Sequence, residues 1–154
     1  MSFILASDAL TGNSGYVTGT IGNKVRQLAE IASITATVTK SKSAFKCMGY
    51  KGTQHKATGW NGTGSITMYV ISSDWNKMVN DYVKTGKDCY FDIVVTNEDA
   101  GSTAGTQRVS LYRCNIDALD IAKFDANAEY LQVTSNFTFE GTDLLEKFSY
   151  QFTN

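Results

Sequence analysis

The single histidine, His55, limits the nucleophilic chemistry open to this chain of 154 residues. A Ser-His-Asp or Cys-His arrangement uses histidine as its general base, so such a site would have to form around this one position. His55 lies in a polar stretch with lysine and glycine nearby, which is typical of an exposed loop. The sequence therefore predicts no catalytic residue and a protein that is not an enzyme.

Metal and cofactor sites are not indicated either. The three cysteines, Cys47, Cys89 and Cys114, lie far apart and include no CxxC pair, so they are interpreted as reduced thiols. The stretch 125–129 begins like an EF-hand loop, but Tyr130 takes the place of the required glycine. The nearest carboxylate pairs are interpreted as solvated loop or edge residues: Glu98 with Asp99, and Asp117 with Asp120. We expect no bound metal and no cofactor.

A glycine cluster at Gly59, Gly62 and Gly64 has the order GxxGxG. No Lys-Ser or Lys-Thr follows it and a strand is expected next, so a turn is predicted instead of a phosphate-binding loop. Trp60 lies inside this cluster. Its ring would suit stacking on a sugar, and it would equally suit a contact between subunits, because tryptophan is enriched at interfaces.

Size and charge narrow the class of protein. A length of 154 residues fits one globular domain, so a single domain over residues 1–154 is expected. The 14 basic and 15 acidic residues form no long run of one sign, which disfavours a free-standing nucleic-acid binder. The apolar run 3–5 is too short for a signal peptide, and no stretch approaches the ~20 apolar residues of a membrane-spanning helix. We expect a soluble protein made in the cytoplasm, with no membrane insertion of its own.

Two-residue alternation predicts a protein made mainly of β-strands. Between Ile31 and Thr39, apolar residues alternate with Ser33, Thr35, Thr37 and Thr39, and the same period recurs over 131–140. Further β-rich runs lie at 16–21, 42–48, 65–71, 90–96 and 107–119, with the small residues 100–105 as a hairpin loop. About seven or eight strands are expected from this count.

One segment, at about 73–85, has a helical period. Its apolar residues recur at helical spacing, so we expect this stripe to lie against the sheet: Trp75, Met78, Val79, Tyr82 and Val83. Ser73 is placed to cap the start, and Gly86 follows the end, where a left-handed cap is usual.

The chain contains no proline, a residue that often protects the open edges of β-sheets. Monomeric β proteins often protect open sheet edges with proline, charges or bulges, because an open edge is a template for another chain. Apolar or aromatic residues also occur on both faces of the run 110–116, so that strand needs cover on both sides. Both features favour a protein that assembles with copies of itself.

Two blocks of sequence then point to a family. The stretch Gly49–Gly64, GYKGTQHKATGWNGTG, and the stretch Tyr82–Asp99, YVKTGKDCYFDIVVTNED, resemble the tail tube proteins of contractile phages, defective prophages and phage-tail-like bacteriocins of Gram-positive bacteria. The resemblance extends from the strand at Gly15 to the segment 145–148. It implies a small antiparallel β-barrel or sandwich with one flanking helix.

The resemblance also implies a function. Hexameric rings would stack into the inner tube of a contractile tail, a conduit for DNA as passing cargo or for membrane puncture. Its partners would be other copies, the tail sheath protein, and tape-measure and baseplate proteins, and the chain would be incorporated into a virion tail or tail-like particle. A headless bacteriocin would use a similar tube. The alternative from another class is a monomeric β-sandwich module that binds a ligand such as a carbohydrate.

Two groups of residues are expected to serve assembly. The polar stretch 49–61 would form a loop that contacts the next ring, with these residues in the contact: Gly49, Tyr50, Thr53, Gln54, His55, Lys56 and Trp60. The hydroxyl face of the strand near residue 35 would line the channel: Ser33, Thr35, Thr37 and Thr39.

Overall fold

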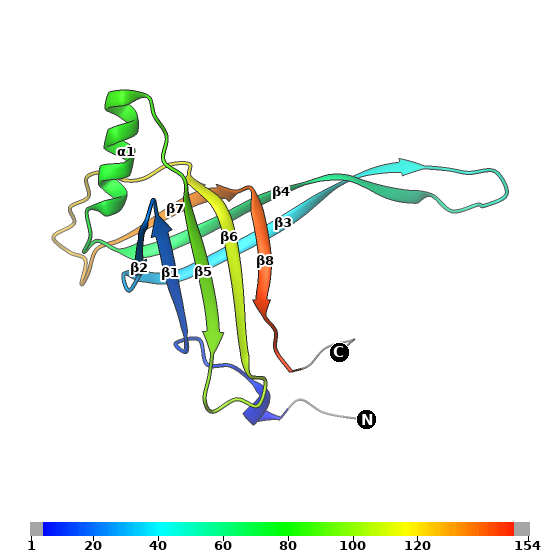
Figure 1. Ribbon diagram of the computed structural model, residues 1–154, viewed down its shortest axis with the longest axis horizontal. Helices are drawn as coiled ribbons and strands as arrows, with labels where there is room; N and C mark the ends of the chain where they lie inside the picture. Colours follow the sequence, from blue (N-terminus) through cyan, green and yellow to red (C-terminus); the bar gives the residue numbers. More distant parts are fainter. Residues whose placement is uncertain (1–4, 150–154) are drawn as a thin grey trace.

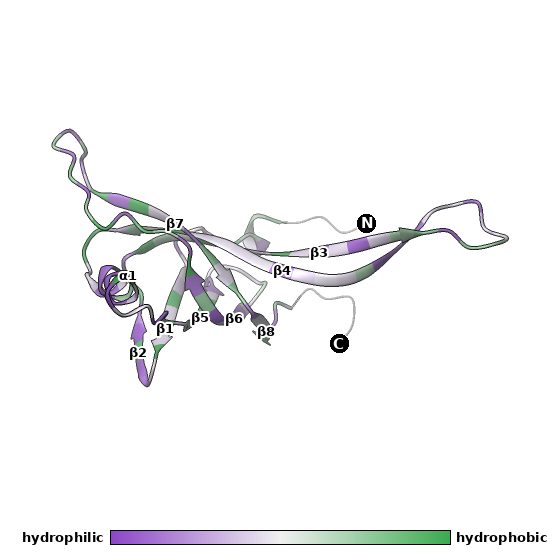
Figure 2. Ribbon diagram, turned by 90° about the horizontal axis from the view of Figure 1, so that it is seen from above, coloured by the Kyte–Doolittle hydropathy of each residue, from purple (hydrophilic) through white to green (hydrophobic). Residues whose placement is uncertain are grey.

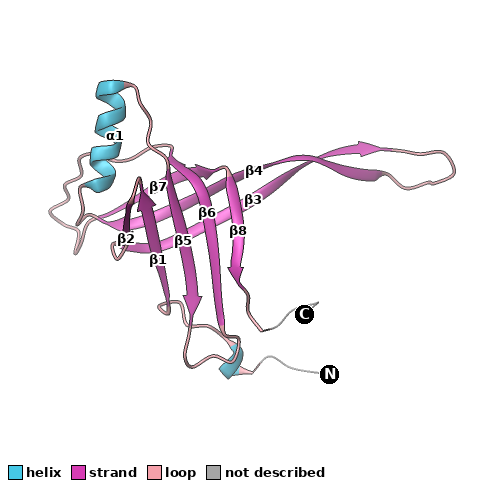
Figure 3. Ribbon diagram, in the orientation of Figure 1, coloured by secondary structure: helices cyan, strands magenta, loops and turns pink. Residues whose placement is uncertain are grey.

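The computed structural model describes residues 5–149, so Phe3 and Ile4 of the short apolar run lie outside it. Most of the described chain is β-strand, with one α-helix and a short 3₁₀ turn, η1 (Ala6–Asp8) (Figure 3). The other elements are β1 (Gly15–Ile21), β2 (Lys24–Gln27), β3 (Ile31–Phe45), β4 (Gln54–Tyr69), α1 (Asp74–Thr85), β5 (Phe91–Glu98), β6 (Thr106–Ile116), β7 (Gln132–Phe139) and β8 (Gly141–Glu146).

All strand pairs are antiparallel, in the order β2-β1-β5-β6-β7-β4-β3, and β8 pairs with β6 beside this path. Strands β2, β1, β5, β6 and β8 form one layer, and β7, β4 and β3 run across it as a second layer (Figures 1 and 2). The sequence left a barrel and a sandwich open, and the sandwich is the better description. The two strands that end the path, β2 and β3, do not pair with each other, so the sheet is not closed into a barrel.

Strand β6 joins the two layers by bending at Arg113. Its first part pairs with β5 and β8, and its last two residues pair with β7. Arg113 has φ 52°, and the pairing with β5 shifts register beside it. The Arg113 Nε donates a 2.6 Å hydrogen bond to Glu140, which joins β7 to β8, and its guanidinium lies 4.2 Å from the centre of the Tyr90 ring. These contacts hold the corner between the layers.

The core lies between the two layers. One layer contributes Val17, Phe91, Ile93, Leu111 and Cys114, and the other contributes Ile66, Met68, Val133, Phe137 and Phe139. The predicted alternation of residues 131–140 is confirmed, because β7 buries Val133, Phe137 and Phe139 in turn and exposes Thr134 and Asn136. Burial of these aliphatic and aromatic side chains is the main stabilising contribution to such a fold.

Several predicted boundaries are wrong. The runs at 31–39 and 42–48 are one strand, β3, and β4 begins at Gln54 instead of residue 65. The strands β2 and β8 were not predicted. Both are short, and all their residues are exposed except Gly141, which is half-buried. The glycine cluster is not a turn: Gly59, Gly62 and Gly64 all lie inside β4. Glycine is required at Gly62 and Gly64 because the rings of Phe139 and Phe137 pack directly over them.

Helix α1 begins and ends close to the predicted residues. Gly86 has φ 73° and donates its N–H to the carbonyl oxygen of Tyr82, which is the expected left-handed cap. Ser73 is the N-cap residue, but its side chain makes no capping hydrogen bond; instead Ser72 Oγ accepts from the N–H of Asp74 at 3.3 Å.

Candidate functional site

The most unusual feature is an arm that extends away from the two layers (Figure 1). Pairing of β4 with β7 ends at Gly62, whereas β3 and β4 continue together to the pair Phe45–Gln54. We call residues 39–61 the arm and residues 46–53 its tip. All arm residues except Gln54 are exposed. An isolated two-stranded hairpin is marginally stable in water, so the arm is suited to packing against another molecule.

The predicted contact residues all lie on this arm, but not in one loop. Gly49, Tyr50 and Thr53 lie in the tip, whereas Gln54, His55 and Lys56 begin β4. Trp60 lies further along β4, opposite Lys40. The loop expected over 49–61 therefore ends at Thr53. The strand escaped detection because polar residues occupy both of its faces, so neither face shows the two-residue apolar period.

The arm combines exposed apolar side chains with positive charge. Met48 is fully exposed at the tip, Tyr50 is 58% exposed, and Trp60 is 46% exposed with its ring centre 6.2 Å from that of Phe139. Between Ile31 and Ser73 the chain carries five lysines and no acidic residue. The lysines are Lys40, Lys42, Lys46, Lys51 and Lys56. The rest of the chain is consequently net acidic.

The second candidate surface is the outer face of the β3–β4–β7 layer. Ser33, Thr35 and Thr37 pair across β3–β4 with Thr67, Ser65 and Thr63, which pair in turn with Thr134, Asn136 and Thr138 of β7. Directly paired residues share a face, so hydroxyl and amide groups cover three strands. Thr39, the fourth residue predicted for this face, continues the row onto the arm. The inner face of the same strands carries Ile34, Ile66 and Phe137.

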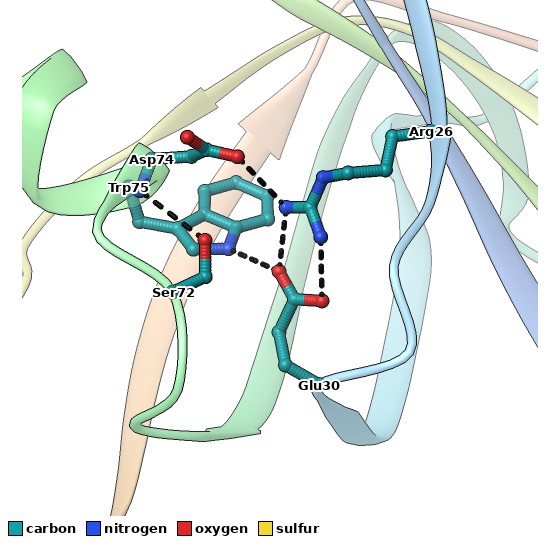
Figure 4. Close-up of polar contacts among 5 residues, drawn as sticks. All are labelled: Arg26, Glu30, Ser72, Asp74 and Trp75. Carbon is teal, nitrogen blue, oxygen red and sulfur yellow. Dashed lines mark hydrogen bonds and ion pairs between the residues drawn. The ribbon is translucent and has the colours of Figure 1, made fainter.

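The third candidate surface lies around α1, whose first turn is tied to the β2–β3 connection (Figure 4). Glu30 is 1% exposed and accepts two hydrogen bonds from Arg26, at 2.8 and 3.1 Å, and one from the Trp75 indole at 3.2 Å. Arg26 also lies 3.1 Å from Asp74. Burial by itself raises the pKa of Glu30, but the hydrogen bonds from Arg26 and Trp75 outweigh it, so this pKa is lowered.

Only the first part of the predicted apolar stripe of α1 lies against the sheet. Trp75 is buried and Met78 and Val79 are half-buried, but Tyr82 is 51% and Val83 74% exposed. The expectation for Tyr82 and Val83 was wrong because the helix continues past the edge of the layer beneath it (Figure 1). A groove of about 340 Å³ lies beside this half of the helix, with Met78, Val79, Tyr82, Cys89, Ile116 and Leu119 in its wall.

The remaining chemistry-bearing residues form no cluster. Among residues 5–149, no group of three or more histidine, cysteine or acidic residues is arranged to hold a metal ion. His55 is exposed on the arm, and all three cysteines are free. Cys114 is fully buried, and burial raises the pKa of its thiol to about 12. In the same part of the chain, no helix is long and apolar enough to cross a membrane.

Sequence reasoning missed the corner formed by Arg113 and the groove beside α1. No local signal marks Arg113, because its positive φ and its contact with Glu140 depend on residues distant in the sequence. No local signal marks the groove either, because its walls come from α1, Asp88 and Cys89, and the segment Asn115–Leu119.

Comparison with known proteins identifies the family. Residues 3–146 match the model of the family described as phage tail tube protein. The phage-like element PBSX protein XkdM of Bacillus subtilis (strain 168) is 42% identical over 123 residues, covering 80% of this chain and 84% of that protein. A second Bacillus subtilis protein, the uncharacterized YqbM, is 42% identical over 121 residues, covering 79% of this chain and 82% of that protein.

Solved structures share the fold. A chain of the sheath–tube complex of the extracellular contractile injection system PVC, in its extended state, superposes with a TM-score of 0.67 at 9% identity, covering 90% of this chain and 93% of that one. With a family match over residues 3–146 and a 42% identical relative in the phage-like element PBSX, this chain belongs to the phage tail tube protein family.

Proposed function

We propose that six copies of the chain close into a ring and that the rings stack into the inner tube of a contractile tail. One observation carries the proposal: β3 has an unpaired outer edge along Ile31–Phe45, and it continues into an arm that is exposed beyond the contact of Trp60 with Phe139 near its base. An open edge of this length is a template for another strand. Pairing with the next copy removes that edge, and a head-to-tail contact closes a ring.

In this assembly the hydroxyl and amide face of the β3–β4–β7 layer lines the channel. Ser33, Thr35, Thr37 and Thr39 belong to this face, which extends over Thr63, Ser65 and Asn136 by direct cross-strand pairing. The paired rows from residue 33 to residue 37 and their partners include no charged residue, so passing DNA or protein meets weakly interacting groups.

The arm makes the contact between rings, with Trp60 as an apolar anchor near its base and Gly49, Tyr50, Thr53, Gln54, His55 and Lys56 at or next to its tip. Support comes from its exposure and from the marginal stability of a lone hairpin. Other tail components complete the particle: a sheath protein around the tube, as in the PVC sheath–tube complex, and tape-measure and baseplate proteins at its end. Synthesis in the bacterial cytoplasm belongs to the same proposal. Capsid genes nearby would distinguish a phage from a headless bacteriocin.

Negative-stain electron microscopy of the purified protein at rising concentration, with light scattering on the same samples, tests the proposal. We expect rings or tubes with a central hole, and a mass that rises in steps of whole rings. A strictly monomeric species, also in the presence of the sheath protein, would contradict it and would favour a ligand-binding module around Trp60.

A further inference from the structure

The groove beside α1 has apolar walls and an acidic rim. Met78, Val79 and Tyr82 of the helix line the groove together with Ile116 at the end of β6 and Leu119 of the β6–β7 connection. The charged residues that line it are both acidic, Asp88 and Asp117. The carboxylates of Asp88 and Asp81 add to burial in raising the pKa of the Cys89 thiol, which also lines this groove. A ligand for this surface therefore needs an apolar group flanked by positive charge.

The tip of the arm has this composition. Met48 is fully exposed and lies between Lys46 and Lys51, with Tyr50 beside it. Methionine is unbranched and flexible, which suits an irregular apolar groove, and a volume of about 340 Å³ accommodates its side chain. The arm contains no acidic residue, so nothing on it would repel the carboxylates of Asp88 and Asp117.

The two surfaces lie at opposite ends of the long axis of the molecule. Figure 1 and Figure 2 both place the tip at one end and α1 with the 117–131 connection at the other. One copy therefore cannot join its own tip to its own groove. A contact between two such surfaces is head-to-tail, which builds rings or filaments rather than closed dimers.

We propose that the tip of the arm of one copy docks into the groove between α1 and the Asn115–Leu119 segment of a second copy. Met48 enters the apolar groove, and Lys46 and Lys51 lie against Asp88 and Asp117. The same contact covers Tyr82, the exposed apolar side chain that walls the groove. This inference rests on the proposed tube and names which surface of the neighbouring copy receives the arm.

Two native cysteines test the contact without any mutation. Cys47 is exposed at the tip next to Met48, and Cys89 lines the groove, whereas Cys114 is buried. Assembled wild-type protein is treated with copper phenanthroline or with a short bismaleimide. A disulfide requires Cα atoms within roughly 7 Å, so docking predicts a ladder of covalent oligomers whose linked peptides contain Cys47 and Cys89.

Mixing variants shows that the link joins different copies. Cys47→Ser alone and Cys89→Ser alone should give no ladder, whereas an assembled mixture of the two should give dimers and nothing longer. Wild-type tubes that form but yield no Cys47–Cys89 link would overturn the docking while leaving the proposed tube intact. Absence of rings and tubes in the wild type would overturn both.

Charge reversal is the second test. Lys46→Glu with Lys51→Glu should raise the protein concentration needed for assembly by at least roughly tenfold at low salt, because like charges then meet. Adding Asp117→Lys should restore part of the loss. A matched control, Lys24→Glu with Lys147→Glu, changes the same charge outside the arm and should assemble like the wild type. Equal effects of both double variants, or no rescue, would overturn the docking.

Discussion

Phe137 of β7 packs its ring over Gly64 of β4 so closely that a Cβ atom at Gly64 would overlap that ring and the carbonyl oxygen of Thr35. The two residues are direct cross-strand partners, and Phe137 is fully buried. Gly62 and Phe139 repeat the arrangement one pleat away. The glycines of β4 thus make room for the largest side chains of the core.

Gly64→Ala should consequently lower the free energy of unfolding by about 1–3 kcal/mol, the usual cost of overpacking a close-packed core. Chemical denaturation followed by tryptophan fluorescence measures the change. Gly59→Ala is the matched control, because it lies on the same strand and a Cβ there has nothing within 4 Å. Equal stability of the two variants would show that the ring of Phe137 shifts without cost.

Elements with a clear apolar period could be predicted from the sequence, whereas features that depend on distant segments could not. Strand β7 and helix α1 were recognised because each has an apolar stripe with a clear period, although α1 buries only the first part of its stripe. The arm was only partly recognised, since a strand exposed on both faces has no apolar period. The lengths of β3 and β4, the bend at Arg113 and the groove beside α1 all depend on pairing between distant segments, which local patterns do not encode.

Glu30 should make stability depend on pH. Its pKa is lowered in the folded protein, so its contribution is fully present above the ordinary pKa of about 4.5 and is lost as the pH falls through the folded pKa. At neutral pH, Glu30→Gln should lower the free energy of unfolding by about 1–3 kcal/mol, because Arg26 and Trp75 lose a buried charged acceptor, while Arg26 itself stays partly exposed beside Asp74. The difference in unfolding free energy between wild type and variant should shrink as the pH falls below about 4.5 and through the folded pKa of Glu30.

Denaturation at several pH values gives this difference directly. Glu98→Gln is a suitable control, since Glu98 is exposed at the end of β5 and should change stability little at any pH. A difference for Glu30→Gln that stays constant from neutral to acidic pH would mean that packing around Trp75, and not the charge, accounts for the loss.

If the hydroxyl face lines the channel as proposed, charge should be tolerated there. Thr35→Lys and Thr37→Lys place their new side chains on the exposed outer face of β3, away from the core. In negative-stain images both variants should form tubes of normal diameter. Only the staining of the central channel should differ from the wild type. Loss of assembly would instead place these positions in a contact between copies.

The arm should be dispensable for folding and necessary for tubes. Thr39 and Asn61 are cross-strand partners, so replacing residues 40–60 by an Asn-Gly turn closes the hairpin at that pair. The removed residues are exposed except for half-buried Gln54, but the ring of Trp60 packs against Phe139, so the shortened chain should lose about 1–2 kcal/mol of stability. Light scattering should find monomers or single rings at concentrations where the full chain forms tubes. Long tubes built by the shortened chain would show that stacking depends on other surfaces.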